Sequence, residues 1–147
     1  MGLVPKFSMN DINAILKQAE EDYTQKLIRA LKFVGEKCVN EAKTNGTYQD
    51  QTANLRNSIG YVIVTDGRVI EENFSISANG SVPSKENPLK YGRELAYQVA
   101  PKFRGIALIV VAGMKYANYV ESKGRVVLTS AEQLAKIQAP ILLKQLR

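Results

Sequence analysis

The residue types of this chain argue against catalysis before any fold is considered. The sequence contains no histidine and one cysteine, Cys38. Histidine is the commonest general base and the commonest metal ligand. A zinc site built from Cys and His therefore cannot form within one chain. We expect no enzymatic activity, no cofactor and no bound metal.

The carboxylates are the remaining groups that could do acid–base chemistry, and their spacing does not favour it. Glu71 and Glu72 are adjacent in an expected strand, so their side chains point to opposite faces and cannot share a substrate. Glu20, Glu21 and Asp22 lie on an expected helix within salt-bridge spacing of Lys17 and predict a solvated face. An enzyme using carboxylates or tyrosine would need acids converging in a cleft, which this spacing does not predict.

Length and composition predict one cytoplasmic globular domain. The chain has 147 residues and is 45% apolar, which suits a single core. No apolar run approaches the roughly 20 residues of a membrane helix, so we expect no membrane partner. Residues 1–7 lack the apolar stretch of a signal peptide and the Ser or Thr of a myristoylation signal.

The positive charge is concentrated in the last third of the chain. The formal net charge is +6, and residues 101–147 hold eight basic residues against Glu121 and Glu132. A basic face of this kind can be solvated surface, or it can meet nucleic acid or an acidic protein surface.

A long amphipathic helix is predicted over residues 8–45. Ser8 to Asp11 reads as a capping box, apolar residues then recur every three or four positions, and Asn45-Gly46 is a stop signal. Cys38 falls on the apolar stripe, which predicts a buried thiol. Such a helix would be about 50 Å long, more than a small domain covers. We expect that it breaks or bends, or that one end projects and packs on another subunit.

A β-hairpin is predicted over residues 59–78, with Asp66-Gly67 as its turn. A two-residue loop places Thr65 opposite Arg68 and Ile59 opposite Phe74. The face predicted to meet the core then consists of Ile59, Tyr61, Ile63, Ile70, Phe74 and Ile76.

The remaining segments complete an α+β domain with a small, mostly antiparallel sheet of about four strands between the long N-terminal helix and a C-terminal helix. The expected segments are a mobile loop at 79–87, a helix from Pro88 to Ala100, a strand from Ile106 to Ala112, a short helix or turn from Tyr116 to Ser122, a last strand from Arg125 to Thr129, and a helix over 130–146 that Thr129 or Ser130 caps and Pro140 interrupts. The strand at 106–112 is apolar on both faces, so it belongs at the sheet centre or between helices and a partner. We expect one domain over 1–147, with the remaining strands within 104–129.

Two short stretches carry a resemblance. Leu55 to Ile59 reads Leu-Arg-Asn-Ser-Ile, and Tyr116 to Glu121 reads Tyr-Ala-Asn-Tyr-Val-Glu, followed by Gly124. Both resemble signature stretches of the phage tail-component family, the head–tail joining or tail-completion proteins of long-tailed phages and prophages. Ala53 stands where that family often has glycine. The similarity spans roughly residues 16–146.

The resemblance implies a structural neck or tail-completion protein without catalysis. It would partner itself in a ring, other phage connector or tail proteins, and DNA passing through the channel. It would be cytoplasmic in the host during assembly and then part of the virion. The alternative is a nucleic-acid-binding domain that uses the basic last third, which needs those basic residues on one face.

The candidate structural or interface residues come from the two stretches and their surroundings: Leu55, Arg56, Ser58, Tyr116, Tyr119, Glu121 and Arg125. Leu55 is expected to be buried, and Arg56 to reach a backbone carbonyl or a carboxylate. Glu121 and Arg125 are expected to hold the turn that precedes the last strand. Tyr116 and Tyr119 share a helical face and are core residues or interface anchors.

Overall fold

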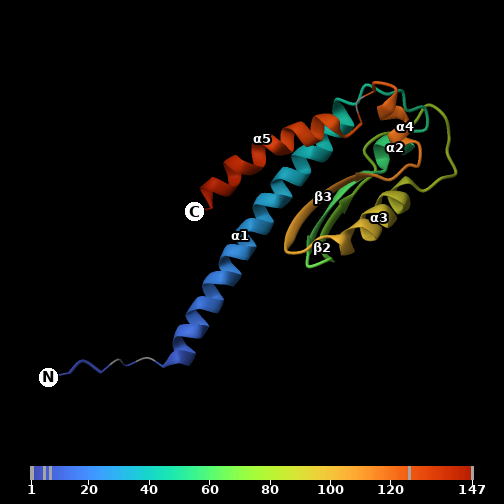
Figure 1. The fold of residues 1–147 in the computed structure, drawn as a ribbon. Helices are drawn as coiled ribbons and strands as arrows, with labels where there is room; N and C mark the ends of the chain where they lie inside the picture. Colours follow the sequence, from blue (N-terminus) through green and yellow to red (C-terminus); the bar gives the residue numbers. More distant parts are fainter. Residues whose placement is uncertain (1, 5, 7, 126, 147) are drawn as a thin grey trace.

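The computed structural model describes residues 2–4, 6, 8–125 and 127–146, with Tyr119 described by its backbone alone. The architecture is α+β, as predicted: a three-stranded antiparallel sheet lies between helix α1 on one face and helix α3 on the other, and helix α5 packs along α1 (Figure 1). The apolar core is accordingly split into one cluster on each face of the sheet.

Helix α1 spans Met9–Thr44 as one unbroken helix of 36 residues. The predicted capping box is confirmed: the Asp11 N–H donates to Ser8 Oγ over 3.2 Å, and the Ser8 N–H donates to Asp11 Oδ2 over 2.9 Å. The first fully buried residue along the helix is Val34. The N-terminal part of α1 therefore extends well beyond the sheet and α5 (Figure 1). The helix therefore projects at one end and does not break, which is one of the two expected outcomes.

The sheet contains β1 (Ile59–Thr65), β2 (Arg68–Phe74) and β3 (Ile106–Ala112), in the order β2-β1-β3. Among the described residues there is no fourth strand, so the predicted strand from Arg125 to Thr129 is wrong. Val126 lies outside the described residues. The N–H groups of Leu128 and Thr129 donate to the Glu121 carboxylate, and Thr129 is the first residue of α5. These two N–H groups are therefore not free to pair with a strand.

The central position in the sheet belongs to β1, where the sequence favoured β3. Six of the seven β1 residues are buried. Strand β3 is apolar on both faces because helices cover both: Leu108 and Val110 belong to the cluster beneath α1, while Ile109 and Val111 belong to the cluster beneath α3. Two-sided burial by helices thus gives an edge strand the composition of a central one.

A β-bulge changes the predicted register of the hairpin. Thr65 pairs with Arg68 as expected, but the register shifts between Ile63 and Val64. Ile70 becomes the extra residue and is 43% exposed. Beyond the bulge each partner moves by one position, so Gly60 pairs with Phe74, which joins the α3 cluster.

One further core assignment on the return strand is also corrected. Strand β2 ends at Phe74, four residues before the predicted end at Ala78. Ile76 therefore lies outside the sheet and is 64% exposed. A one-residue bulge and an early strand end together remove three of the six residues predicted for the core face.

The remaining helices follow turn and cap signals. Helix α3 spans Pro88–Val99, with the Asn87 side chain as its N-cap, and a 3₁₀ turn (η1, Ala100–Lys102) follows it. Helix α4 spans Ala117–Ser122, as predicted. Helix α5 spans Thr129–Gln145 and continues through Pro140, so of the expected kink or fresh start near Ala139 the fresh start is wrong. That proline is exposed and removes the hydrogen bond to the carbonyl four residues earlier.

The contact between α1 and α5 buries Cys38, as its place on the apolar stripe predicted. Its thiol donates to the Ala131 carbonyl over 3.4 Å. Burial, reinforced by the nearby Glu41 carboxylate, raises the pKa of the Cys38 thiol. The thiol is thus a packing group with little thiolate character at neutral pH.

Helix α1 lies directly on the aromatic ring of Tyr61 in β1. A Cβ atom on Gly35 would lie 2.8 Å from that ring. The Tyr61 hydroxyl donates to Glu36 Oε1 over 2.9 Å, and Asn73 Nδ2 donates to the same oxygen over 2.6 Å. Burial, followed by the Glu36 hydrogen bond and charge, raises the pKa of Tyr61. One carboxylate on α1 therefore joins the helix to both β1 and β2.

We expect Gly35→Ala to destabilise the fold by about 1–3 kcal/mol through overpacking, although alanine is the better helix former by about 1 kcal/mol. Urea unfolding of the single variant measures the loss. In a Tyr61→Val background the added methyl group has room, and the same substitution should stabilise. A destabilising effect of equal size in both backgrounds would contradict the contact.

Candidate functional site

The first motif and the chain just before the second motif, far apart in the sequence, meet at Ser58. Its hydroxyl donates to the Leu55 carbonyl over 2.7 Å and accepts the Met114 N–H over 3.3 Å. Its carbonyl accepts the Gly113 N–H over 3.2 Å. We call this region the motif junction; it consists of α2 (Asn54–Asn57), Ser58 and residues 113–122. The buried serine hydroxyl thus connects the first motif to the chain just before the second.

Leu55 anchors the first motif in the core, as predicted. It is 1% exposed and packs in the cluster beneath α1. Ala53, which precedes the short helix, has φ 59° and ψ 10°, a left-handed conformation. Glycine adopts this conformation without steric strain. The turn therefore has a physical reason to carry glycine where this chain carries alanine.

Arg56 does not make the contact that the sequence predicted. Its backbone N–H, and not its side chain, donates to Asp50 Oδ2 over 2.8 Å. The guanidinium carbon lies 5.6 Å from the centroid of the Tyr48 ring, and Nε is buried without a hydrogen bond. The side chain therefore packs on an aromatic face, while the loop is fixed by the backbone.

Three backbones come together beside Ser58, and the glycines that permit this were missed in the sequence. A Cβ on Gly92 of α3 would lie 2.4 Å from the Ser58 carbonyl oxygen. A Cβ on Gly113 would lie 2.2 Å from the Gly92 nitrogen. Because the atoms in the way are backbone atoms, no rotamer change can make room. A glycine directly after an apolar strand was the available signal for this close approach.

Two asparagines of α2, also missed, hold the segment that follows the hairpin. Asn57 Nδ2 donates to the Ala78 carbonyl over 2.9 Å, and Asn57 Oδ1 accepts the Ser77 and Ala78 N–H groups. Asn54 Nδ2 donates to Ser84 Oγ over 2.7 Å and to Glu86. The loop at 79–87 contains no helix or strand, and these hydrogen bonds attach it to α2. Its mobility stays a prediction.

Tyr116 lies at the surface of the motif junction and is 39% exposed. Its remaining burial, then the Asp50 and Glu86 carboxylates, raises the pKa of its hydroxyl. The side chain borders a 270 Å³ hollow that Tyr91 and Lys115 also line. The side chain of Tyr119 lies outside the described residues, so its role as core residue or interface anchor stays a prediction.

Glu121 caps helix α5, a role that was predicted for Thr129 or Ser130. Its carboxylate accepts the Leu128 N–H over 3.2 Å, the Thr129 N–H over 3.0 Å and the Thr129 hydroxyl. Partial burial favours the neutral acid, but these hydrogen bonds outweigh it and lower the pKa of Glu121. The N-cap position is Leu128, which has no side-chain cap hydrogen bond, so the predicted cap by Thr129 or Ser130 is wrong.

Arg125 ties the end of this region to the C-terminal end of α1. Its Nη1 donates to the Thr47 carbonyl over 3.3 Å. Glu121 and Arg125 thus hold the connection between α4 and α5, where the sequence expected a turn before a strand.

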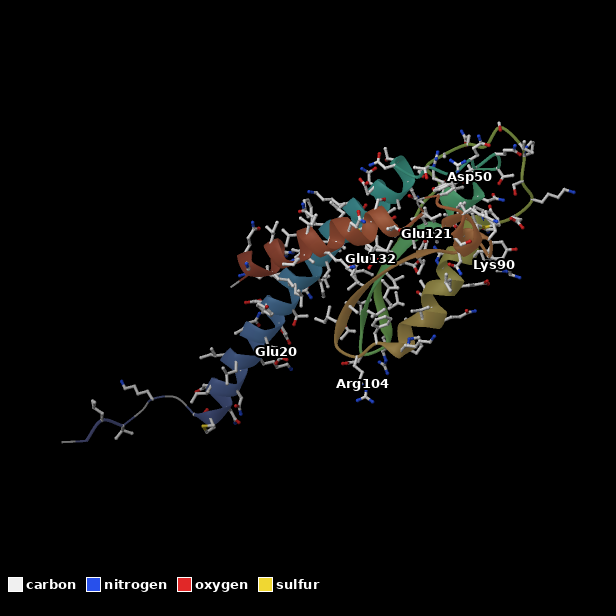
Figure 2. The ribbon with its side chains drawn as sticks, turned by 45° about the horizontal axis from the view of Figure 1, so that its top comes forward. Glu20, Asp50, Lys90, Arg104, Glu121 and Glu132 are labelled. Atoms are coloured by element: carbon white, nitrogen blue, oxygen red, sulfur yellow. The ribbon has the colours of Figure 1, made fainter. Side chains whose placement is uncertain are left out.

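The basic residues of the last third do not converge on one face. Lys102 and Arg104 precede β3, whereas Lys115 and Arg125 follow it, so they lie at opposite ends of the sheet. Figure 2 shows Arg104 at the end of the sheet away from Glu121 and Lys90. This distribution counts against the single basic face that the nucleic-acid alternative requires.

The described residues of the motif junction hold backbone segments together through hydrogen bonds. Among the described residues no group of three or more His, Cys, Asp or Glu side chains could hold a metal ion. Within the same residues, no helix combines the length and the apolar character needed to span a bilayer. No protein-family model, no curated protein and no solved structure matches this chain.

We expect Leu55→Ala to destabilise the protein by about 2–5 kcal/mol, because it leaves a cavity beneath α1. Leu143→Ala on α5 is the matched control: that side chain is 42% exposed, and a surface truncation changes stability by about 0.5 kcal/mol or less. Thermal scans of both variants measure the difference. An unchanged midpoint for Leu55→Ala would refute its role as an anchor.

We expect Glu121→Gln to destabilise by about 0.5–2 kcal/mol at pH 7, the usual effect of losing a cap. The folded-state pKa of Glu121 is lowered, so its contribution is present above the unfolded value of about 4.3 and is lost as pH falls through the folded value. The difference between variant and wild type should therefore shrink at low pH in urea titrations. Glu132→Gln, at an exposed i,i+4 pair, is the control, with an effect of about 0.5 kcal/mol or less. A Glu121→Gln effect that is the same at low and neutral pH would contradict the mechanism.

Proposed function

We propose that this protein is a structural component that joins heads to tails in a long-tailed phage or prophage, as a neck or tail-completion protein without catalytic activity. It works as copies of itself arranged in a ring, in contact with other connector or tail proteins. Its place is the host cytoplasm during assembly and the virion afterwards.

The projecting end of α1 is the observation that carries this proposal. Residues 9–23 are exposed along almost their whole length, and the exposed set includes Met9, Ile15, Leu16 and Tyr23. An isolated helix segment of this length is marginal in water, and its apolar stripe is satisfied only by packing. A chain built this way suits assembly with neighbouring subunits.

The motif junction supports the same proposal. Ser58 joins the first stretch that resembles the phage tail-component family to Met114, two residues before the second stretch, and Tyr116 lies at the surface there. A hydrogen-bonded unit with an exposed aromatic side chain suits a repeated contact around a ring. DNA passing through such a ring stays a prediction, as does the nucleic-acid-binding alternative.

Loss of this gene should leave filled heads and finished tails that fail to join. Electron microscopy of a lysate from a phage that lacks the gene measures this, because separate heads and tails are directly visible. Supplying the gene in trans is the control and should restore joined particles. Joined virions in the deletion lysate would sink the proposal.

A further inference from the structure

The projecting end of α1 carries an apolar stripe that continues out of the core. Where α1 packs on the sheet and α5, the stripe is buried at Val34, Cys38 and Ala42. At the 3.6-residue helical period, the same stripe runs outward through Tyr23 and Leu16. The stripe that holds α1 to the sheet and α5 therefore extends past both, with nothing in the described chain covering it.

The same end of the helix is acidic. Residues 9–23 hold four acidic residues and one lysine, a net charge of −3. The helical period places Glu20 and Asp22 on the two sides of the apolar stripe, while Glu21 lies on the opposite side of the helix. Figure 2 shows Glu20 on the part of α1 that extends beyond the body. A complementary surface is therefore apolar along its middle with basic residues beside it.

Helix α5 has such a surface on the side that faces away from α1. Ile137 and Ile141 lie one turn apart and are 62% and 49% exposed. Lys144 follows on the same side, and Lys136, which pairs with Glu132 one turn earlier over 2.7 Å, lies at one margin of this surface. These residues belong to the third of the chain that carries the whole +6 excess.

Geometry excludes this contact within one molecule. Helix α1 is unbroken, and its free end leads away from the C-terminal end of α5 (Figure 1). Pairing of two projecting ends would bring two segments of charge −3 together. The inner part of the α1 stripe is not available to another subunit, because the sheet and α5 already cover it.

We propose that the projecting end of α1 in one copy packs on the outer face of α5 in the next copy, with Glu20 and Asp22 facing Lys136 and Lys144. The contact joins two different surfaces, so each copy receives one helix end and offers another. Repetition of such a head-to-tail contact closes into a ring or continues as an open chain. The inference deepens the proposed function by naming the surface through which copies of the ring subunit join.

Site-directed crosslinking of the purified chain tests the contact. A chain with Ala19→Cys and Ile141→Cys together, treated at high protein concentration with a short bismaleimide, should give a ladder of species larger than dimers. Each single variant should stay monomeric, and a mixture of the two should give a dimer. Wild type, whose Cys38 is buried, should not react. A covalent dimer from Ala19→Cys alone, or no species beyond a dimer from the double variant, would overturn the proposal.

Charge reversal distinguishes this contact from a general apolar association. Glu20→Lys with Asp22→Lys, added to the double-cysteine chain, should abolish the ladder. Glu21→Lys is the matched control on the opposite side of the same exposed helix turn and should leave it intact. A ladder that survives the first change, or is lost equally with the second, would contradict the assignment. Circular dichroism verifies that all variants are folded.

The outcome for the contact is separable from the outcome for the function. Crosslinking needs no phage, whereas the lysate experiment needs no knowledge of the interface. Absence of the ladder together with unjoined heads and tails would remove the contact and leave the proposed function. A ladder together with joined virions in the deletion lysate would keep the contact and remove the proposed function.

Discussion

The close approach of α1 to the face of Tyr61 is the constraint on which the rest of the structure depends. Gly35 permits it, because any side chain there would enter the van der Waals shell of the ring. With the helix that close, the Glu36 carboxylate reaches both Tyr61 and Asn73, so one helix position fixes two strands. The same helix then supplies Cys38 and its neighbours as the platform for α5. Removal of this contact would loosen the sheet and the C-terminal helix together.

A second close approach between backbone segments holds α3 on the other face of the sheet. Gly92 and Gly113 let α3, the end of β3 and the beginning of β1 meet at backbone distance. Ser58 satisfies the backbone groups exposed there, with its hydroxyl as both donor and acceptor. The sheet and the helices packed on it are therefore held by close contacts at small residues and by buried hydrogen bonds. The projecting part of α1 makes no such contacts among the described residues. The proposed assembly function rests on this division between a tightly packed region and an unsupported helix end.

The motif residues divide in the same way between support and surface. Leu55 and Ser58 are buried and act on the fold, and Glu121 acts through the first turn of α5. Tyr116 is partly exposed and places an aromatic side chain at the surface of the motif junction. Most of the residues that carry the resemblance therefore stabilise the fold and do not themselves lie at the surface. The proposed contact between copies lies elsewhere, on the acidic end of α1 and the outer side of α5.

Local signals in the sequence determined the features that depend on neighbouring residues alone. The capping box at Ser8, the stop at Asn45, the turn at Asp66-Gly67 and the burial of Leu55 follow from spacing and side-chain type. The length of the apolar stripe also determined that α1 must bend or project.

Tertiary structure decided the features in which distant segments compete for the same groups. The bulge at Ile63 depends on how β2 meets both β1 and α3, so the Asp66-Gly67 turn could not predict where Phe74 points. The capture of the Leu128 and Thr129 N–H groups by Glu121 turned a predicted strand into the start of a helix. Strand β3 pairs with β1 alone and so lies at the edge of the sheet, while helices bury both of its faces. In each case, the deciding partner lies in another element, which periodicity within one segment cannot indicate.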